Sequence, residues 1–386
     1  MQRLDRIRNV FHSWRVAETM RAYRMVEWGG APRAAEVPVP APAAGQVLVR
    51  VAGCGLCRSD LTMRRMPRSG GERLGWTVPF TLGHETAGWV AALGAGVDGL
   101  AEGDAVALAA AASCGTCWFC VRGLDNDCPH GLAGRGYGRD GGLADYVLVT
   151  GRRGLLPLGG LDPAHAGPLT DAGATAYHAV RRALPRITAG GTAVVLGAGG
   201  LGLFAVQFLR ALTAARVVAV DPGPDRRALA QEAGAVPVDG VDASTAGRLR
   251  QLTGRAGADA VLDFVGTDET IAAGVAAVRA GGAYGLVGSA GGRLAKPWFG
   301  TLPRDGEVYT FQGATIADTQ EAIALAGAGL IHNRVEEFGF DAVDEAYSRL
   351  AAGSLTGRAV VVFDRRPPQP SGVEPLPNAN NIRVES

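Results

Sequence analysis

The sequence predicts an α/β protein with two domains, one of short antiparallel strands and one with a doubly wound parallel sheet. Three observations lead to this fold class. At 386 residues the chain is too long for one ordinary core, and two domains of about 100–200 residues are expected. Hydrophobic residues make up 47% and charged residues 19% of the chain, which permits a sizeable core and excludes wholesale disorder. The third observation is a change of pattern near residue 170.

The charge balance argues against two classes of partner. Lys and Arg number 38 against 37 Asp and Glu, a formal net charge of +1. Proteins that bind nucleic acid or an anionic membrane usually carry a basic excess, so neither partner is expected. No apolar run approaches the ~18–20 residues of a membrane-spanning helix. With no secretory signal recognised, we expect a cytoplasmic protein.

Short Val-rich segments separated by Gly and Pro fill the chain from about residue 22 to 167. Spaced strands with turn residues between them predict an antiparallel β-rich domain. The clearest segments are residues 46–53, 86–94, 104–110 and 143–150.

Beyond about residue 171, apolar strands alternate with helical patterns. Residues 192–200 lead into an apolar-periodic helix at 201–214, and residues 216–221 precede the next helix. Further strands are expected at 259–266 and 282–288. Regular strand–helix alternation predicts a parallel sheet with helices on both faces.

The two ends of the chain differ from both domains. Residues 1–20 carry four arginines among apolar residues, which fits either an amphipathic targeting helix or an N-terminal extension ahead of Met20. The extension is the preferred interpretation. Residues 367–386 are rich in Pro and Asn with little to bury, so a disordered tail is expected.

A glycine motif opens the second domain. Residues 197–202 read Gly-Ala-Gly-Gly-Leu-Gly, directly after a strand and at the start of a helix, the context in which GxGxxG binds a dinucleotide. Gly197 makes the tight turn, Gly199 lets the backbone approach the pyrophosphate, and Gly202 lets helix pack on strand. The phosphates lie at the helix N-terminus.

The residue at the end of the next strand selects the cofactor. Asp221 places a carboxylate where the adenosine ribose hydroxyls bind, and it would repel a 2′-phosphate. NAD is therefore favoured over NADP. Arg226 either flanks the adenosine or is a solvated helix residue.

The cysteine pattern predicts a closed metal site. Four of six cysteines lie in a short segment with the spacing C-x2-C-x2-C-x7-C. Four thiolates complete a tetrahedral Zn²⁺ shell and leave no position for water or substrate, so the site is structural. An iron–sulfur cluster is disfavoured because nothing else indicates electron transfer. The four residues are Cys114, Cys117, Cys120 and Cys128.

A second set of candidate ligands is dispersed along the chain. Cys57, His84 and Asp171 supply a thiolate, an imidazole and a carboxylate, a shell that leaves one zinc position open for an alcohol. Taken singly, each His or Asp is more often an ordinary satisfied polar residue. Cys54 and Cys57 also have the spacing of a redox pair, but Cys54 is interpreted as a buried apolar residue.

These motifs together resemble the zinc-dependent alcohol dehydrogenases of the medium-chain dehydrogenase/reductase superfamily. The resemblance covers roughly residues 21–365 and rests on motifs in family order: GLCRSD at 55–60, GHE at 83–85, the four cysteines, TDAGATAYHA at 170–179 and the GxGxxG. The TDAG element is similar to that of bacterial secondary-alcohol dehydrogenases with Asp as third zinc ligand. Many relatives have Cys there.

The resemblance implies a GroES-like, partly barrel-shaped β catalytic domain at residues 21–169 and 313–366, with a Rossmann NAD-binding domain at 170–312. It implies two zinc ions per chain, a catalytic one held by Cys57, His84 and Asp171 and a structural one held by the four cysteines. Relatives are dimers or tetramers, so a homodimer or homotetramer is expected.

The resemblance also assigns roles to individual residues. Glu85 approaches the metal during ligand exchange, Asp60 orients His84, and Ser59 takes the alcohol proton. Thr62 stands where well-known relatives carry the histidine that ends the proton relay, so the relay is expected to leave through the cofactor ribose and water. Expected cofactor contacts are Arg58 at the pyrophosphate, Thr175 and Leu201 at the nicotinamide, and Gly200, Val265 and Val287.

The expected reaction is reversible oxidation of an alcohol, secondary in preference, to a ketone or aldehyde with hydride transfer to NAD. One alternative is a dedicated biosynthetic enzyme for a benzylic, allylic or sugar-derived alcohol. A second is a zinc-stabilised NAD-binding sensor without catalysis, and a zinc-free reductase of the same superfamily is disfavoured by the complete ligand set. Four aromatic residues either line the substrate pocket or belong to the core or a domain interface: Trp76, Phe80, Trp118 and Trp298.

Overall fold

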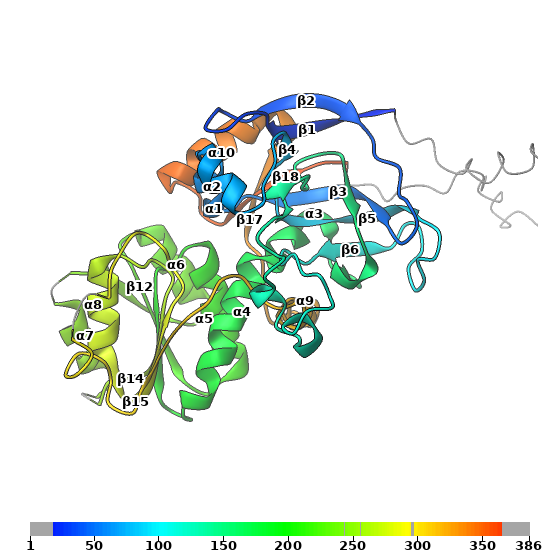
Figure 1. Cartoon of the computed structure of the whole chain (residues 1–386). Helices are drawn as coiled ribbons and strands as arrows, with labels where there is room; N and C mark the ends of the chain where they lie inside the picture. The colour runs from blue at the N-terminus through cyan, green and yellow to red at the C-terminus, as the bar shows by residue number, and fades with distance from the viewer. Residues whose placement is uncertain (1–17, 243, 255, 295–296, 365–386) are drawn as a thin grey trace, which may run out of the picture.

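The computed structural model describes residues 18–242, 244–254, 256–294 and 297–364. They form a β-rich domain and a parallel-sheet domain side by side (Figure 1). The predicted tail at 367–386 and residues 1–17 of the predicted extension lie outside the described residues. The predicted boundary at residue 21 falls inside the first strand, because Thr19 and Met20 already pair with Pro38 and Val37.

The β-rich domain is built on a seven-stranded sheet of order β10-β6-β5-β3-β18-β17, in which β9 also pairs with β3. A three-stranded sheet of order β2-β1-β4 lies over it. Met25, Val49 and Phe80, from three different strands, meet in one core, so the two sheets close as a partial barrel. The strands are β1 (Thr19–Met25), β2 (Arg33–Pro38), β3 (Val47–Gly55), β4 (Phe80–Thr81), β5 (Glu85–Leu93), β6 (Ala105–Leu108), β7 (Gly134–Arg135), β8 (Gly138–Arg139), β9 (Tyr146–Val149), β10 (Leu155–Pro157), β17 (Val335–Gly339) and β18 (Arg358–Val362).

The second domain has a six-stranded sheet of order β13-β12-β11-β14-β15-β16 with every pair parallel. This is the order of the doubly wound dinucleotide-binding fold, and the prediction is confirmed. Alternate residues face opposite layers, as Val195 packs in the core with α4 and α5 and Val194 in the core with α7 and α8. The strands are β11 (Thr192–Leu196), β12 (Arg216–Asp221), β13 (Val236–Asp239), β14 (Ala258–Asp263), β15 (Val278–Leu286) and β16 (Glu307–Thr310).

Helices cover both faces of the parallel sheet and flank the β-rich domain. They are α1 (Arg58–Met63), α2 (Arg68–Arg73), α3 (Pro163–Ala166), α4 (Ala172–Ala183), α5 (Gly200–Leu212), α6 (Pro224–Glu232), α7 (Thr245–Leu252), α8 (Asp268–Ala277), α9 (Ile316–Gly327) and α10 (Val343–Ala352). Short 3₁₀ turns add η1 (Cys120–Arg122), η2 (Asp125–Asp127), η3 (Arg152–Gly154), η4 (Gly167–Thr170), η5 (Leu184–Arg186) and η6 (Phe340–Ala342).

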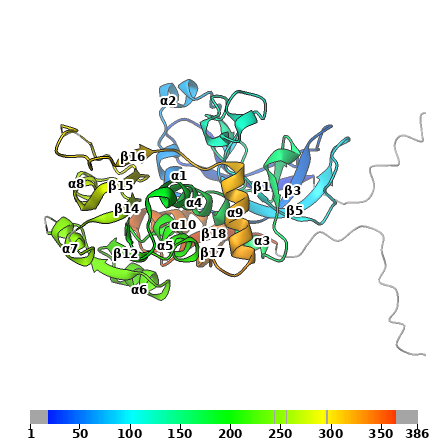
Figure 2. The ribbon, with the colours of Figure 1, turned by 90° about the horizontal axis from the view of Figure 1, so that it is seen from below.

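After β16 the chain returns to the first domain. Helix α9 packs beside α4 (Figure 2), where the buried His178 ring lies 2.7 Å from the Asp318 carboxylate. Strand β18 then pairs antiparallel with β3. The connection fits the expected re-entry near residue 313, although the domain limits themselves stay a prediction.

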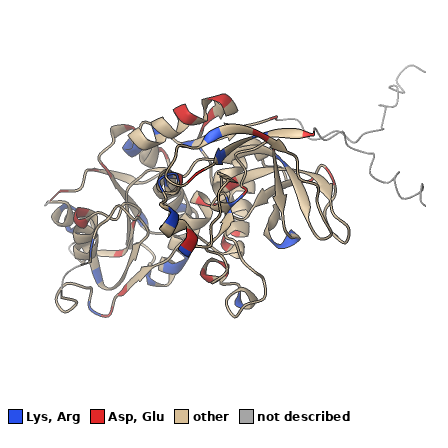
Figure 3. Ribbon diagram, turned by 45° about the horizontal axis from the view of Figure 1, so that its top comes forward, with Lys and Arg blue, Asp and Glu red and all other residues tan. Residues whose placement is uncertain are grey.

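Acidic and basic residues are interspersed over both domains (Figure 3). Within the described part of the chain, every helix is too short or too polar to cross a membrane.

Candidate active site and metal centres

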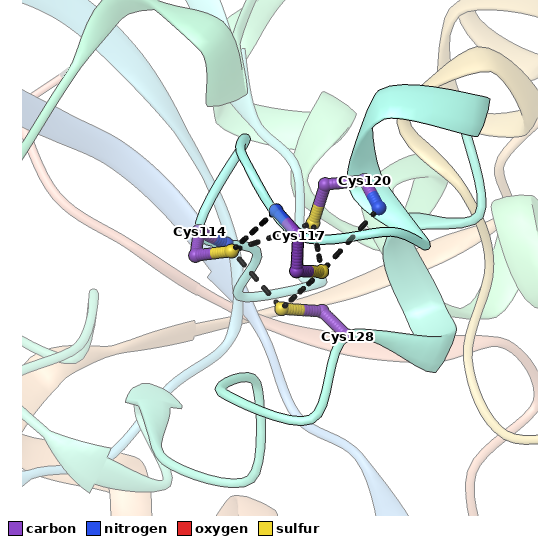
Figure 4. A group of neighbouring side chains, drawn as sticks. All are labelled: Cys114, Cys117, Cys120 and Cys128. Atoms are coloured by element: carbon purple, nitrogen blue, oxygen red, sulfur yellow. Dashed lines mark hydrogen bonds between the residues drawn. The ribbon is translucent and has the colours of Figure 1, made fainter.

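The four predicted cysteines converge in a lobe that follows β6, with their sulfur atoms turned toward one another (Figure 4). The Sγ–Sγ distances are 3.5 Å for Cys117 and Cys120, 3.8 Å for Cys117 and Cys128, and 3.9 Å for Cys114 and Cys120. A tetrahedral shell with Zn–S bonds of ~2.3 Å has edges of about 3.8 Å. The sulfur arrangement therefore fits a closed zinc site.

Backbone N–H groups around the lobe favour the thiolate form. Cys117 donates its N–H to Cys114 Sγ at 3.3 Å, and Cys114 donates to Cys128 Sγ at 3.4 Å. Hydrogen bonds from the backbone of Thr116 and Cys117 lower the pKa of Cys114 to about 5. A deprotonated sulfur is the form that binds metal.

The dispersed ligand set also comes together. The ligand atoms of Cys57, His84, Glu85 and Asp171 all lie within 4.8 Å of one another. Cys57 ends the loop after β3 and caps α1. His84 directly precedes β5, Glu85 is its first residue, and Asp171 precedes α4. Because β3 and β5 are paired with Gly55 opposite Glu85, two of the three segments are fixed by one strand ladder. Thiolate, imidazole and carboxylate donors are the ligands that zinc binds in proteins.

Asp60 faces the His84 ring, and the two facing atoms have no other hydrogen-bond partner among the described residues. Its Oδ1 lies 3.3 Å from His84 Nδ1, while Asp171 Oδ2 lies 3.6 Å from the other ring nitrogen, Nε2. Burial lowers the pKa of His84, but the two carboxylates outweigh it and raise the pKa well above its ordinary value. The pocket thus attracts positive charge, as a metal site must.

Glu85 makes a contact that the sequence analysis missed. Arg358, on β18, donates to Glu85 Oε1, and both side chains are buried. The other oxygen, Oε2, is buried without a hydrogen-bond partner among the described residues, so it is free to accept a bond from a bound group. Burial raises the pKa of Glu85 to about 8 although Arg358 opposes it. No motif surrounds Arg358, so only its charge in an otherwise apolar strand could have signalled it.

Asp171 carries the permanent negative charge of the cluster. Burial raises its pKa, but the hydrogen bond and charge of His84 outweigh burial and lower the pKa to about 2. Ser59 Oγ lies 3.4 Å from His84 Nε2 and is exposed, as is Thr62. A hydroxyl therefore stands between the ligands and solvent.

Cys54 does not form a redox pair with Cys57. It is fully buried, it lies 3.6 Å from Thr86 Oγ1, and both cysteines are free thiols. Burial raises the pKa of Cys54 to about 12, so this sulfur stays protonated and behaves as the small apolar residue expected.

The glycine loop has the geometry of a phosphate cradle. Gly197 has φ +87°, which favours glycine, and a Cβ at Gly202 would overlap the Gly197 carbonyl oxygen. A Cβ at Gly199 would meet no atom within 4 Å, which leaves open space above the N-terminus of α5. At Gly200 a Cβ would lie 2.7 Å from Arg358 Cδ. Arg358 therefore contacts both the ligand cluster and the loop.

Asp221 closes the loop from the side. Its carboxylate accepts the N–H groups of Ala198 at 2.9 Å and Gly223 at 2.8 Å. Arg226 approaches this carboxylate at 3.9 Å and donates to Gly353 O at 2.8 Å, so it is not a freely solvated side chain. These contacts leave further lone pairs of Asp221 for hydroxyl donors.

The remaining expected cofactor residues lie on the elements around the loop. Val265 lies over Gly197, and Val287 donates its N–H to Asp263 O at the ends of β14 and β15. Thr175 is buried on α4, Leu201 is half-buried in the first turn of α5, and Arg58 is exposed at the start of α1.

The four aromatic candidates divide into two groups. Trp76 and Phe80 belong to the core of the β-rich domain, with the Trp76 indole donating to Leu132 O at 2.7 Å. Trp118 and Trp298 are 59% and 72% exposed. Neither exposed residue is a core residue, so of the two structural alternatives the core is wrong for both.

Comparison with known proteins gives consistent relatives. Residues 43–159 match the family model for the alcohol dehydrogenase GroES-like domain, and residues 200–328 match that for zinc-binding dehydrogenases. The chain is 34% identical to an NAD-dependent alcohol dehydrogenase of Sulfurisphaera tokodaii, over 89% of this chain and 100% of the relative. It is 32% identical to a D-arabinose 1-dehydrogenase (NADP(+)) of Saccharolobus solfataricus, over 84% and 93%. The crystal structure of the Aeropyrum pernix alcohol dehydrogenase superposes with a TM-score of 0.81 at 31% identity, covering 89% of this chain and all of that one.

Proposed function

Because this chain belongs to the zinc-binding alcohol dehydrogenase family, we propose that it reversibly oxidises an alcohol to a ketone or aldehyde with hydride transfer to NAD. The observation that carries the proposal is the position of Arg358, which contacts both the ligand cluster and the glycine loop. Metal ligands and nucleotide loop thus lie beside the same side chain, as hydride transfer between their occupants requires.

In this proposal Cys57, His84 and Asp171 hold a catalytic zinc, and the four-cysteine lobe holds a structural zinc. A zinc ion held there would supply a Lewis acid for the substrate oxygen, and NAD bound at the glycine loop would supply the hydride acceptor. Asp60 holds the His84 ring by the nitrogen turned away from Asp171. Glu85, paired with Arg358, keeps one buried oxygen without a hydrogen-bond partner among the described residues.

Ser59 is proposed to receive the alcohol proton. Its hydroxyl lies within 3.4 Å of a ligand nitrogen and is exposed, so it can accept a proton and pass one to water. Thr62, which cannot change charge near pH 7, leaves the relay without a titrating terminus.

The glycine loop is proposed to receive the pyrophosphate above Gly199, with Gly200 beside it and Arg58 supplying charge. Asp221 is proposed to bind the adenosine ribose, with Arg226 at its side. The nicotinamide half of the site is proposed to be lined by Thr175, Leu201, Val265 and Val287. The NAD-dependent names of several relatives support this choice of cofactor.

A secondary alcohol is the proposed substrate class, on the basis of Asp171 as third ligand. A sugar-derived alcohol is the second candidate, favoured by the similarity to D-arabinose 1-dehydrogenase. We also predict that the protein is a homodimer or homotetramer and that it is cytoplasmic. Light scattering measures the number of subunits.

The deciding experiment follows NADH absorbance with zinc-replete protein, NAD⁺ and a panel of secondary, primary, benzylic and sugar alcohols. We expect two zinc ions per chain and fastest turnover of secondary alcohols.

Cys57→Ala should hold one zinc, bind NAD as before and lose turnover, whereas the matched variant Cys54→Ala keeps two zincs and activity. Wild-type turnover by Cys57→Ala would refute the catalytic zinc, and silence on simple alcohols with activity on sugars would favour the second candidate.

A further inference from the structure

A buried carboxylate behind the ligand cluster depends on a residue near the end of the chain. Asp60 Oδ2 accepts two hydrogen bonds, from the Cys57 N–H at 3.0 Å and from the Tyr347 hydroxyl at 3.1 Å. Its other oxygen, Oδ1, faces His84 Nδ1 at 3.3 Å. Asp60 is completely buried, so its orientation is set by these three groups.

The Tyr347 ring is itself packed against an aromatic ring and a guanidinium group. Tyr347 lies on α10 and is 1% exposed. The Tyr23 ring stacks on it with centroids 6.0 Å apart and an interplanar angle of 28°, and the Arg64 guanidinium lies 4.5 Å from its centroid. Arg64 and Tyr23 both contact Asp344, one turn earlier on α10. Burial and these contacts restrict the ring, and its hydroxyl is directed at Asp60.

The Tyr347 hydroxyl can determine how the Asp60 carboxylate is oriented. A carboxylate held by two donors on one oxygen presents the other oxygen in a fixed direction. A ligating imidazole needs such an acceptor at its second nitrogen, because that acceptor fixes the ring orientation and its basicity. The chain of contacts runs from Tyr347 through Asp60 to His84.

We propose that Tyr347 is a positioning residue of the catalytic metal site, which locks Asp60 so that His84 binds the metal in one orientation. This inference rests on the proposed function, since it needs a metal at Cys57, His84 and Asp171. If so, helix α10 contributes to the affinity of the site for its metal, although α10 is far from the metal ligands in sequence.

The variant Tyr347→Phe removes one oxygen and keeps the contacts of the ring with Tyr23 and Arg64. Without the second donor Asp60 can rotate, and His84 loses its fixed acceptor. Loss of the residue that directly contacts a ligating histidine typically weakens metal binding about 10–100-fold. Tyr347 contacts His84 only through Asp60, so we expect a smaller effect, an increase of about three- to tenfold in the zinc dissociation constant. The Co²⁺-substituted variant should show shifted d–d bands, since these report ligand geometry.

Chelator competition measures zinc release, and the four-cysteine site serves as internal reference in the same molecule. Tyr309→Phe is the matched control, because it removes another buried tyrosine hydroxyl, which donates to Ala179 O at 2.7 Å. Unchanged release and an unchanged cobalt spectrum in folded Tyr347→Phe would overturn the inference. Absence of catalytic zinc from the wild-type protein would instead refute the proposed function.

A double-mutant cycle tests the route. If Tyr347 acts through Asp60, Tyr347→Phe has no further effect on zinc affinity in an Asp60→Asn background. Additive losses would show that Tyr347 acts by another path and would also overturn the inference.

Discussion

Arg358 on β18 donates to the carboxylate of Glu85 at the start of β5, so the last strand of the fold supplies a charge to the centre of the ligand cluster. Both side chains of this ion pair are buried, and the two residues are far apart in the sequence. It ties the stability of the β-rich domain to the site.

Arg358→Met should destabilise the protein, because it leaves the Glu85 carboxylate buried without a partner. Removing one member of a buried ion pair typically costs about 3–5 kcal/mol. Urea unfolding at pH 9, above the pKa of Glu85, measures this loss. The double variant Arg358→Met/Glu85→Gln should recover part of it, and a loss below about 1 kcal/mol in the single variant would contradict the pairing.

The zinc-free protein should lose stability as the pH rises from about 4.5 to 8. The pKa of Glu85 is raised from 4.5 to about 8, so over this range the folded protein holds a proton that the unfolded chain has released. Stability falls wherever the native state binds more protons, by about 1 kcal/mol per pH unit for one group. His84, whose pKa is also raised, acts in the same direction, so Glu85→Gln isolates the Glu85 part. Equal slopes for both proteins would exclude Glu85 as the source.

Cys117→Ser should reduce the zinc content from two ions to one and loosen the lobe. Three thiolates bind zinc more weakly than four, and the folding of such lobes depends on the metal. Elemental analysis measures the zinc, and hydrogen exchange of residues 113–131 measures the loosening. Cys54→Ala, a cysteine outside both sites, should keep two ions. Retention of both zincs by Cys117→Ser would exclude the four-cysteine shell.

Two glycines of the loop should respond in opposite ways to alanine. Gly199→Ala adds a methyl group in open space, so the melting temperature should stay near that of the wild type while NAD affinity falls at least about tenfold, because the methyl occupies the pyrophosphate position. Gly202→Ala overlaps the Gly197 carbonyl and should cost about 1–3 kcal/mol of unfolding free energy. Calorimetry and NAD titration of both variants separate the two effects, and normal NAD binding by Gly199→Ala would refute the proposed cradle.

Asp221→Ser should shift cofactor preference toward NADP. The change removes the charge that repels a 2′-phosphate, and it also frees the N–H groups of Ala198 and Gly223. The ratio of kcat/KM for NAD and NADP measures the preference. Asp225→Ser, an exposed carboxylate on the following helix, is the matched control, and the same ratio in both variants would count against Asp221.

Features encoded by neighbouring residues could be predicted from the sequence. The parallel sheet, the glycine loop and the four cysteines each occupy a continuous segment with its own periodicity or spacing. The Cys57, His84 and Asp171 cluster is assembled from three segments, and it was predicted only because each segment resembles a family motif. The predicted limit at residue 21 divides β1, because Met20 resembles a start position in the sequence but pairs with Val37 in the fold.

Arg358 and Tyr347 could not be predicted in this way. Each lies in the final part of the chain, in a strand or helix with no motif, and reaches its partner through tertiary pairing alone. Arg358 acts because β18 joins β3 beside β5, and Tyr347 because α10 packs against α1. Such contacts depend on the strand order and on helix packing, which cannot be predicted from a single sequence without a motif.

The insertion of β18 beside β3 also sets an order of assembly on the ribosome. Strand β3 is synthesised early and pairs with β9 over Val47–Arg50, but its segment Gly53–Gly55 has no partner on that edge until β18 has emerged. The strands from β11 to β16 are contiguous and need no partner from elsewhere, so the nucleotide-binding half can complete its sheet while translation continues. The metal-binding half completes its own sheet only once β18 has been made, and until then the open segment Gly53–Gly55 of β3 needs protection from other nascent chains.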